Sequence, residues 1–378
     1  MIDRGVVWPW AMVPGLTRIA HGRWASGGYA LLIWLSLLWI LVARWDRVVA
    51  APGGPLDQRI ALATLVLGLV VLWWWSFREA RGEAGGAESG TVDGSRTGLF
   101  RAGLARSFRG NRIAAVGAGA VVAFYLVALL APFLAPYDPT LHGDLVRMRL
   151  QAPSGAHLLG TDQFARDILS RIVYGARVSL SIGLLAVGIA VTLGTAVGAV
   201  AGYLGGRVDG LIMRFVDMVI SFPRLVLLIT IIALFEPSIL LIVVVLGLTQ
   251  WPFTARLVRA EILSLREREF IQAGHALGFS RGRIIFRHLI PNSLGPVIVA
   301  ATLGIGDAII LEAGLSFLGL GVQPPTPSWG TMVADGRGQL MGAWWLSTFP
   351  GFAIVLTVLA FNLAGDGLRD YFDPRLRS

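Results

Sequence analysis

Long stretches without a charged side chain limit the possible folds of this chain more than any other feature. Residues 178–203, for example, contain none. A helix of about 20 apolar residues crosses the roughly 30 Å hydrocarbon core of a bilayer. The predicted spans are residues 24–43, 60–77, 113–134, 178–203, 211–235, 237–255, 293–317 and 340–364. We therefore predict an all-α, polytopic membrane protein with a core of about six transmembrane helices and an N-terminal hairpin of two.

These spans predict three regions. Residues 1–77 would form an accessory membrane hairpin, and residues 78–108, rich in Gly, Ser, Glu and Arg, a flexible cytoplasmic linker. The main membrane domain would follow at residues 109–378. The hairpin could be an anchor or a partner-contact module, or an appended segment without a role of its own.

Composition supports the membrane prediction and excludes several function classes. Charged residues make up 15% of the chain, against about 25% in soluble domains. The net charge of +9 fits arginine-rich loops that orient a membrane protein, so we expect a lipid bilayer and no nucleic acid as partner. All 32 basic residues are arginine, so the chain lacks the lysine of a Walker P-loop. Any energy from ATP must therefore come from a partner protein.

One predicted span, residues 211–235, carries the charged residues Arg214, Asp217 and Arg224. Each would cost about 2.5 to 3.5 kcal/mol at a helix centre. Either the helix begins near Leu211 with its charges close to the inner surface, which we prefer, or the segment is re-entrant. Arg214 and Asp217 are three residues apart and could pair. Pro223 should kink the helix because it lacks an N–H group.

The loop at residues 256–291 contains seven arginines and should lie in the cytoplasm. An even number of spans would place both termini on the same side. Phe270, Gly274 and Leu277 recur at helical spacing, and Gly278 can end that helix. Ser280 can cap a second helix, which Pro291 would stop. The two helices could form a projecting elbow that another protein approaches closely, or they could lie on the bilayer surface.

The sequence FIQAGHALGFSRGRIIFRHLIPN at residues 270–292 resembles the cytoplasmic "EAA" loop of ABC-importer permeases. The matching positions are Gln272, Ala273, Gly274, Gly278, Ile290 and Pro291. Gln, Gly and Ile replace the usual Glu, Ala and Leu, while the spacing from Gly to Pro is intact. The resemblance implies that this loop is the coupling element that docks into a cleft of the ATPase subunit.

Further stretches resemble the second permease of dipeptide, oligopeptide and nickel importers. They are LAPYDP (134–139), HLLGTDQFARDILSRIVYGARVSLSIG (157–183), SFP (221–223) and EAGLSFLGLGVQPPTPSWG (312–330). The resemblance covers about residue 109 to the C-terminus. It implies an inner-membrane subunit that works with ABC ATPase subunits, a second permease chain and an extracytoplasmic substrate-binding protein.

Several charged residues have two possible roles. Asp307 and Glu312 could line the pore, or they could be buried carboxylates that fix helix packing, which we favour for Glu312. Asp162, Arg166, Asp167 and Arg171 should lie on the outer face. Their role could be a solvated surface helix with an Asp167–Arg171 pair, or contact with a binding protein or gate.

We find no metal-ligand spacing, no cofactor motif and no catalytic constellation, so we predict a transport subunit and not an enzyme. The rival prediction is a secondary transporter, which often shows two repeated halves with broken helices. The sequence shows no such repeat.

Overall fold

The structure is a computed structural model that describes residues 24–85, 111–141 and 143–372. Every secondary-structure element in these ranges is a helix, and the only bridge between extended residues there joins Thr161 to Asp167. The all-α prediction is therefore confirmed. The chain forms two compact units, residues 1–99 with 126–136 and residues 100–125 with 137–378.

The first unit contains the N-terminal hairpin and a short segment from later in the chain. Its elements are α3 Trp24–Ala43, α4 Trp45–Ala50, η1 Ala51–Gly53, α5 Leu56–Gly85 and α8 Ala131–Leu134. Leu37, Ile40 and Leu65 of the hairpin share one hydrophobic cluster with Leu130 and Phe133. The hairpin is therefore packed around the segment that follows the first helix of the main domain.

Arg47 adds polar contacts to the same packing. Its guanidinium donates to the carbonyl oxygens of Pro132 (2.9 Å), Ala135 (2.6 Å) and Pro136 (2.9 Å). Helix α5 continues to Gly85, which extends helical structure into the stretch predicted as a linker. Residues 86–110 of that stretch lie outside the described residues.

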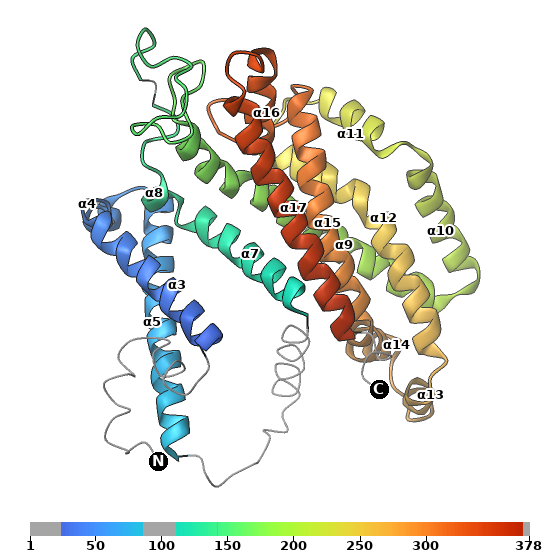
Figure 1. Cartoon of the computed structure of the whole chain (residues 1–378). Coiled ribbons are helices and arrows are strands. Elements are labelled where there is room, and N and C mark those ends of the chain that lie inside the picture. The colour runs from blue at the N-terminus through green and yellow to red at the C-terminus, as the bar shows by residue number, and fades with distance from the viewer. Residues whose placement is uncertain (1–23, 86–110, 142, 373–378) are drawn as a thin grey trace. The chain divides into compact units, whose positions relative to one another are not determined.

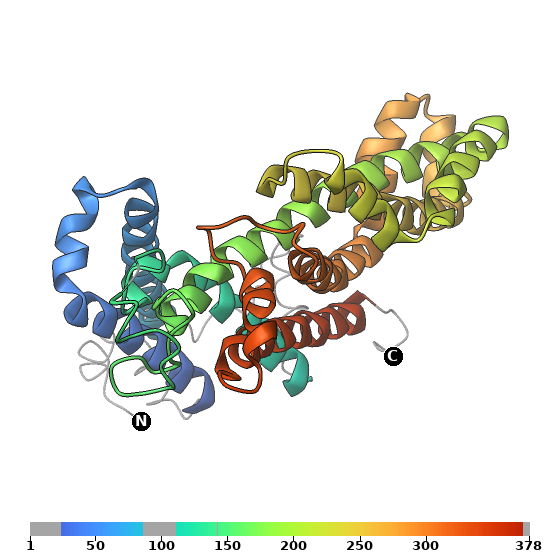
Figure 2. The ribbon, with the colours of Figure 1, turned by 90° about the horizontal axis from the view of Figure 1, so that it is seen from above.

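The second unit is a bundle of long apolar helices (Figure 1). Its elements include α9 Ile168–Leu204, α10 Gly206–Ser221, α11 Arg224–Ala233, α12 Ile239–Arg266, α15 Ile290–Phe317 and α17 Trp345–Phe372, while α7 Arg112–Leu129 begins in this unit. Within the described residues, five helices are long and apolar enough to cross a membrane, or six if α10 and α11 form one span. Figures 1 and 2 show α15 and α17 side by side.

Three glycines allow α9 to approach α12 closely. Gly194, Gly198 and Gly202 lie one turn apart, and a Cβ atom on each would come within 2.7, 2.4 and 2.9 Å of a backbone oxygen of α12. Small residues at every fourth position let the backbones of membrane helices pack in van der Waals contact. This spacing explains why α9 and α12 form the most extensive helix pair of the bundle.

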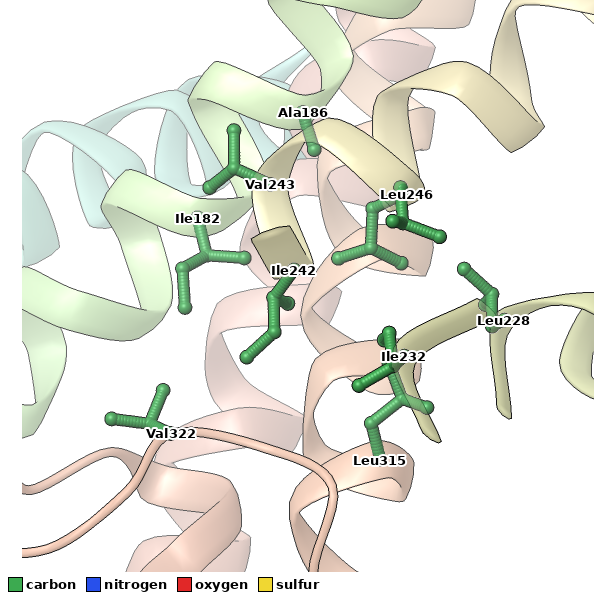
Figure 3. Packing of buried hydrophobic residues seen from close by; sticks show 10 residues of the cluster. Ile182, Ala186, Leu228, Ile232, Ile242, Val243, Leu246, Leu315 and Val322 are labelled. Carbon is green, nitrogen blue, oxygen red and sulfur yellow. The ribbon is translucent and has the colours of Figure 1, made fainter. Parts of the chain in front are cut away.

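The predicted kink at Pro223 is confirmed, because α10 and α11 meet there at an angle of 81°. Pro223 cannot donate a hydrogen bond to the preceding turn, so the helix stops and restarts. Leu228 and Ile232 of α11 are fully buried against α9, α12 and α15 (Figure 3). The second half of the bent pair is thus fixed by the core.

Candidate functional site: the elbow and the charged clusters

Residues 269–291, which we call the elbow, join α12 to α15. Helix α13 Glu269–Ala276 is followed by α14 Arg281–Ile284 and a π-helical turn at Ile285–Leu289. Figure 1 shows α13 and α14 at the end of the bundle where α17 finishes, opposite α16 Trp329–Gly336. The predicted pair of short helices is therefore present.

The turn between the two helices depends on Gly278. The Phe279 N–H donates to the Gly274 carbonyl and the Gly278 N–H to the His275 carbonyl, both at 3.0 Å. This pair of bonds is a Schellman motif, and Gly278 takes the left-handed conformation that the motif requires, with φ of +75°. Ser280 then caps α14 by accepting a hydrogen bond from Arg283 N–H. The first helix thus ends before Gly278 and the second begins after Ser280, as predicted.

One face of the elbow is fixed to the bundle. Ile271, Ile284 and Leu289 are buried in a cluster with residues of α9 and α12. The Phe279 ring covers Gly274, where a Cβ atom would lie 3.2 Å from the ring. The Arg283 guanidinium lies 4.2 Å from the centre of the same ring. These contacts hold the two short helices at a defined angle.

The other face is open. Leu277 and Phe286 are each 72% exposed. Gln272, Ala273 and Gly278 are exposed too, and a Cβ atom on Gly278 would have no neighbour within 4 Å. The elbow therefore presents an apolar surface that has no cover among the described residues.

The buried face of α13 is formed by Ile271 and Gly274, while Phe270 and Leu277 are exposed. One predicted detail of the elbow is wrong. Pro291 does not stop a helix: it lies in the first turn of α15, which begins at Ile290. Helical structure continues from Arg281 to Phe317, and the Ile290 N–H donates to the Ile285 carbonyl at the end of the π-helical turn. Pro291 has no N–H to donate to that turn, which fits the wider π geometry there.

A second polar group, which we call the 157–171 cluster, contains His157, Asp162, Arg166, Asp167 and Arg171. Each of these residues is at most 5% exposed. One oxygen of Asp162 accepts from Arg166 Nε (2.7 Å) and Arg171 Nη1 (3.1 Å). Its other oxygen accepts from the N–H groups of Phe164 and Arg166. Asp162 therefore pairs with two buried guanidiniums at once.

The predicted pair of Asp167 with Arg171 does not form. Asp167 caps α9 through Ser170 and contacts His157 Nδ1 at 2.9 Å. Arg171 instead reaches Asp162 and, at 3.6 Å, Asp335 of α16. The expectation of a solvated surface helix is also wrong, because burial forces these charges to find partners across the fold.

A cavity of about 550 Å³ opens beside this cluster and is lined in part by Arg166, Arg171 and Asp335. Burial raises the pKa of the Asp335 carboxyl above its usual value, and the nearby Arg171 guanidinium partly offsets this shift. Gln163, Phe164 and Arg337 also line the cavity, so its wall combines charged and apolar groups.

Asp217 lies on α10 and pairs with Arg256 of α12, not with Arg214. A second ion pair joins the same two helices. Arg259 Nε and Nη2 donate to the two carboxylate oxygens of Asp209, each at 2.5 Å. Two of the seven loop arginines thus bind α10. Sequence reasoning missed these pairs because their partners are 39 and 50 residues apart.

Glu312 is fully buried in α15 and accepts hydrogen bonds from three serines. Ser316 donates at 2.8 Å, Ser328 at 3.0 Å and Ser179 at 3.4 Å. Ser179 also accepts the backbone N–H of Trp329. The carboxyl group therefore joins α9, α15 and the start of α16.

Asp307, one and a half turns earlier on α15, has a different setting. Its side chain is exposed, and among the described residues no hydrogen bond or ion pair reaches it. Arg224, at the start of α11, donates to Gln250 Oε1 (3.2 Å) and Thr249 Oγ1 (3.5 Å) of α12. The structure thus separates Asp307 from Glu312, which the sequence had grouped together.

Comparisons with known proteins agree with this architecture. Residues 194–378 match the family described as the inner membrane component of binding-protein-dependent transport systems. Residues 102–153 match the N-terminal transmembrane domain of oligopeptide transport permease C. Residues before 102 match neither description.

The chain is 47% identical over 275 residues to a dipeptide transport system permease protein of Alkalihalophilus pseudofirmus, covering 72% of this chain and 89% of that protein. It is 42% identical to a probable D,D-dipeptide transport system permease protein of Escherichia coli, and the match covers 71% of this chain and 89% of that protein. A solved structure of the MetNI methionine ABC transporter is 19% identical, covers 55% of this chain and 98% of that one, and has a TM-score of 0.45. On the strength of the sequence matches, the chain belongs to the family of inner-membrane permease components of binding-protein-dependent ABC importers.

Proposed function

We propose that this chain forms part of the route by which di- and oligopeptides enter the cell, driven by a separate ATPase. Two of the relatives are named as a dipeptide and a probable D,D-dipeptide permease, which favours peptides over nickel. A second permease chain, a pair of ATPase subunits and an extracytoplasmic binding protein would complete the importer. Both termini would lie in the cytoplasm, although residues 1–23 and 373–378 fall outside the described residues.

The observation that carries this proposal is the elbow, which combines a fixed inner face with an open apolar outer face. Leu277 and Phe286 would enter the cleft of the ATPase, and Gln272, Ala273 and Gly278 would border the contact. Because Ile271, Ile284 and Leu289 join the elbow to α9 and α12, closure of the ATPase pair on ATP would rotate the helices as a rigid body. A secondary transporter would have no use for such a surface.

The test is reconstitution. The complete complex in proteoliposomes should hydrolyse ATP faster when its binding protein is loaded with a dipeptide, and it should import that dipeptide only when ATP is present. Uptake driven by an ion gradient without the ATPase would support the secondary-transporter alternative. Stimulation by nickel and not by peptide would contradict the substrate class while leaving the coupling role in place.

A further inference from the structure

Arg224 and Asp307 lie in the helix bundle, and among the described residues neither has an oppositely charged hydrogen-bond partner. Within the part of the chain that the structure describes, Arg224 hydrogen-bonds to the neutral side chains of Thr249 and Gln250 and to no carboxylate. Asp307 is exposed and has no partner among the described residues. A charge that faced hydrocarbon would cost about 2.5 to 3.5 kcal/mol, so each group should face water or another protein.

Gln250 connects Arg224 to the helix that carries Asp307. The Gln250 amide accepts from Arg224 with its oxygen and approaches the Gly304 carbonyl with its nitrogen at 3.5 Å. A Cβ atom at residue 304 would lie 2.5 Å from that nitrogen, so the amide reaches α15 only because residue 304 is glycine. Asp307 follows Gly304 by one turn of the same helix and lies within electrostatic reach of Arg224. A cation on α11 and an anion on α15 therefore lie within electrostatic reach of each other, and Gln250 of α12 connects their two helices.

This arrangement suits a small molecule that carries both charges. A free peptide at neutral pH has an ammonium group at one end and a carboxylate at the other. The guanidinium of Arg224 offers the planar donors that a carboxylate binds well, and the Asp307 carboxylate can accept from an ammonium group. Glu312 cannot serve in this way, because three serines already occupy its oxygens.

We propose that Arg224 and Asp307 form a zwitterion site on the transport route, in which Arg224 binds the carboxylate end of a peptide and Asp307 its ammonium end. This inference rests on the proposed peptide function. It means that the permease itself selects peptides with free termini, after the binding protein has delivered them.

The test measures equilibrium binding of Ala-Ala, N-acetyl-Ala-Ala and Ala-Ala-amide to the purified complex of permeases and ATPase without binding protein. The wild type should bind Ala-Ala at least about tenfold more tightly than either capped form, which corresponds to one charged contact. Asp307→Asn should abolish the preference over the acetylated form alone. Arg224→Gln should abolish the preference over the amide alone. Ile310→Asn, a polar change at a 50% exposed position on the same helix, should retain both preferences.

Equal affinity of the wild type for all three compounds would overturn the inference. A second result would also overturn it: both single variants lose affinity equally for all three compounds, and the charge-reversed double variant, Arg224→Asp with Asp307→Arg, restores that affinity. Such a pattern describes a structural ion pair. Uptake of Ala-Ala by the reconstituted wild-type importer separates the two proposals. If Ala-Ala is imported while binding ignores the end groups, only the zwitterion site fails. If no peptide is imported, the peptide function fails and the site fails with it.

Discussion

The elbow and the 157–171 cluster are both rich in arginine, yet the fold uses that charge in opposite ways. In the cluster, Arg166 and Arg171 are buried and both pair with Asp162, while Arg171 also lies 3.6 Å from Asp335. In the elbow, Arg281, Arg283 and Arg287 are exposed, and hydrophobic contacts on the other face hold the structure. Arginine content alone therefore does not distinguish a region that holds the fold together from one that is available to a partner. The distinction depends on where the carboxylates lie.

The largest effect should come from removing the carboxylate of the cluster. Asp162→Ala would leave Arg166 without its carboxylate partner and Arg171 with Asp335 alone. The loss of one partner from a buried pair costs about 3 to 5 kcal/mol. We expect a large drop in the thermal unfolding temperature of the purified protein. The control is Asp144→Ala, since the Asp144 side chain is 52% exposed and lies 3.9 Å from Arg147. If the two variants unfolded at the same temperature, the cluster would have no structural role.

A bulky residue at Gly278 should damage function more than stability. Gly278→Val would strain a left-handed residue by about 1 to 2 kcal/mol and widen the exposed face of the elbow. We expect normal membrane insertion but loss of peptide-stimulated ATP hydrolysis. Gly278→Asn tolerates the left-handed conformation and should keep more of the coupling. Normal uptake by the valine variant would refute docking through this turn.

The two ion pairs between α10 and α12 should differ in strength. Asp209 is 14% exposed in its side chain and binds Arg259 through both oxygens, so Asp209→Asn should cost about 1.5 kcal/mol. The Asp217 side chain is 61% exposed, so Asp217→Asn should cost about 0.5 kcal/mol or less. Chemical unfolding of the two variants in one detergent measures the difference, and the reverse order would contradict this ranking.

The smallest expected effect is a pH dependence at Asp335. Because the folded state raises the pKa of this carboxyl, its contribution to stability is largest below the unfolded pKa. That contribution is lost as the pH rises through the folded pKa. The unfolding temperature of the wild type should therefore fall by about 1 °C relative to Asp335→Asn as the pH rises from 4 to 7. A relative rise would show that the pair with Arg171 outweighs burial.

The sequence predicted the helices better than the side-chain partners. Apolar runs and the proline at residue 223 located the spans and the 81° bend, because both depend on local chemistry. The pairings Arg214–Asp217 and Asp167–Arg171 were wrong, because spacing within one helix shows which charges could meet and not which partner burial selects. The roles of Gly278, Asp307 and the elbow as a whole stay predictions until a partner is present.

The contact of Arg47 with three carbonyl oxygens has a practical consequence for anyone who shortens this chain. The carbonyl groups of Pro132, Ala135 and Pro136 would lose their donor if the first hundred residues were deleted. Leu130 and Phe133 would lose their apolar cover at the same time. A shortened chain would therefore expose two large apolar side chains unless those two positions were also substituted.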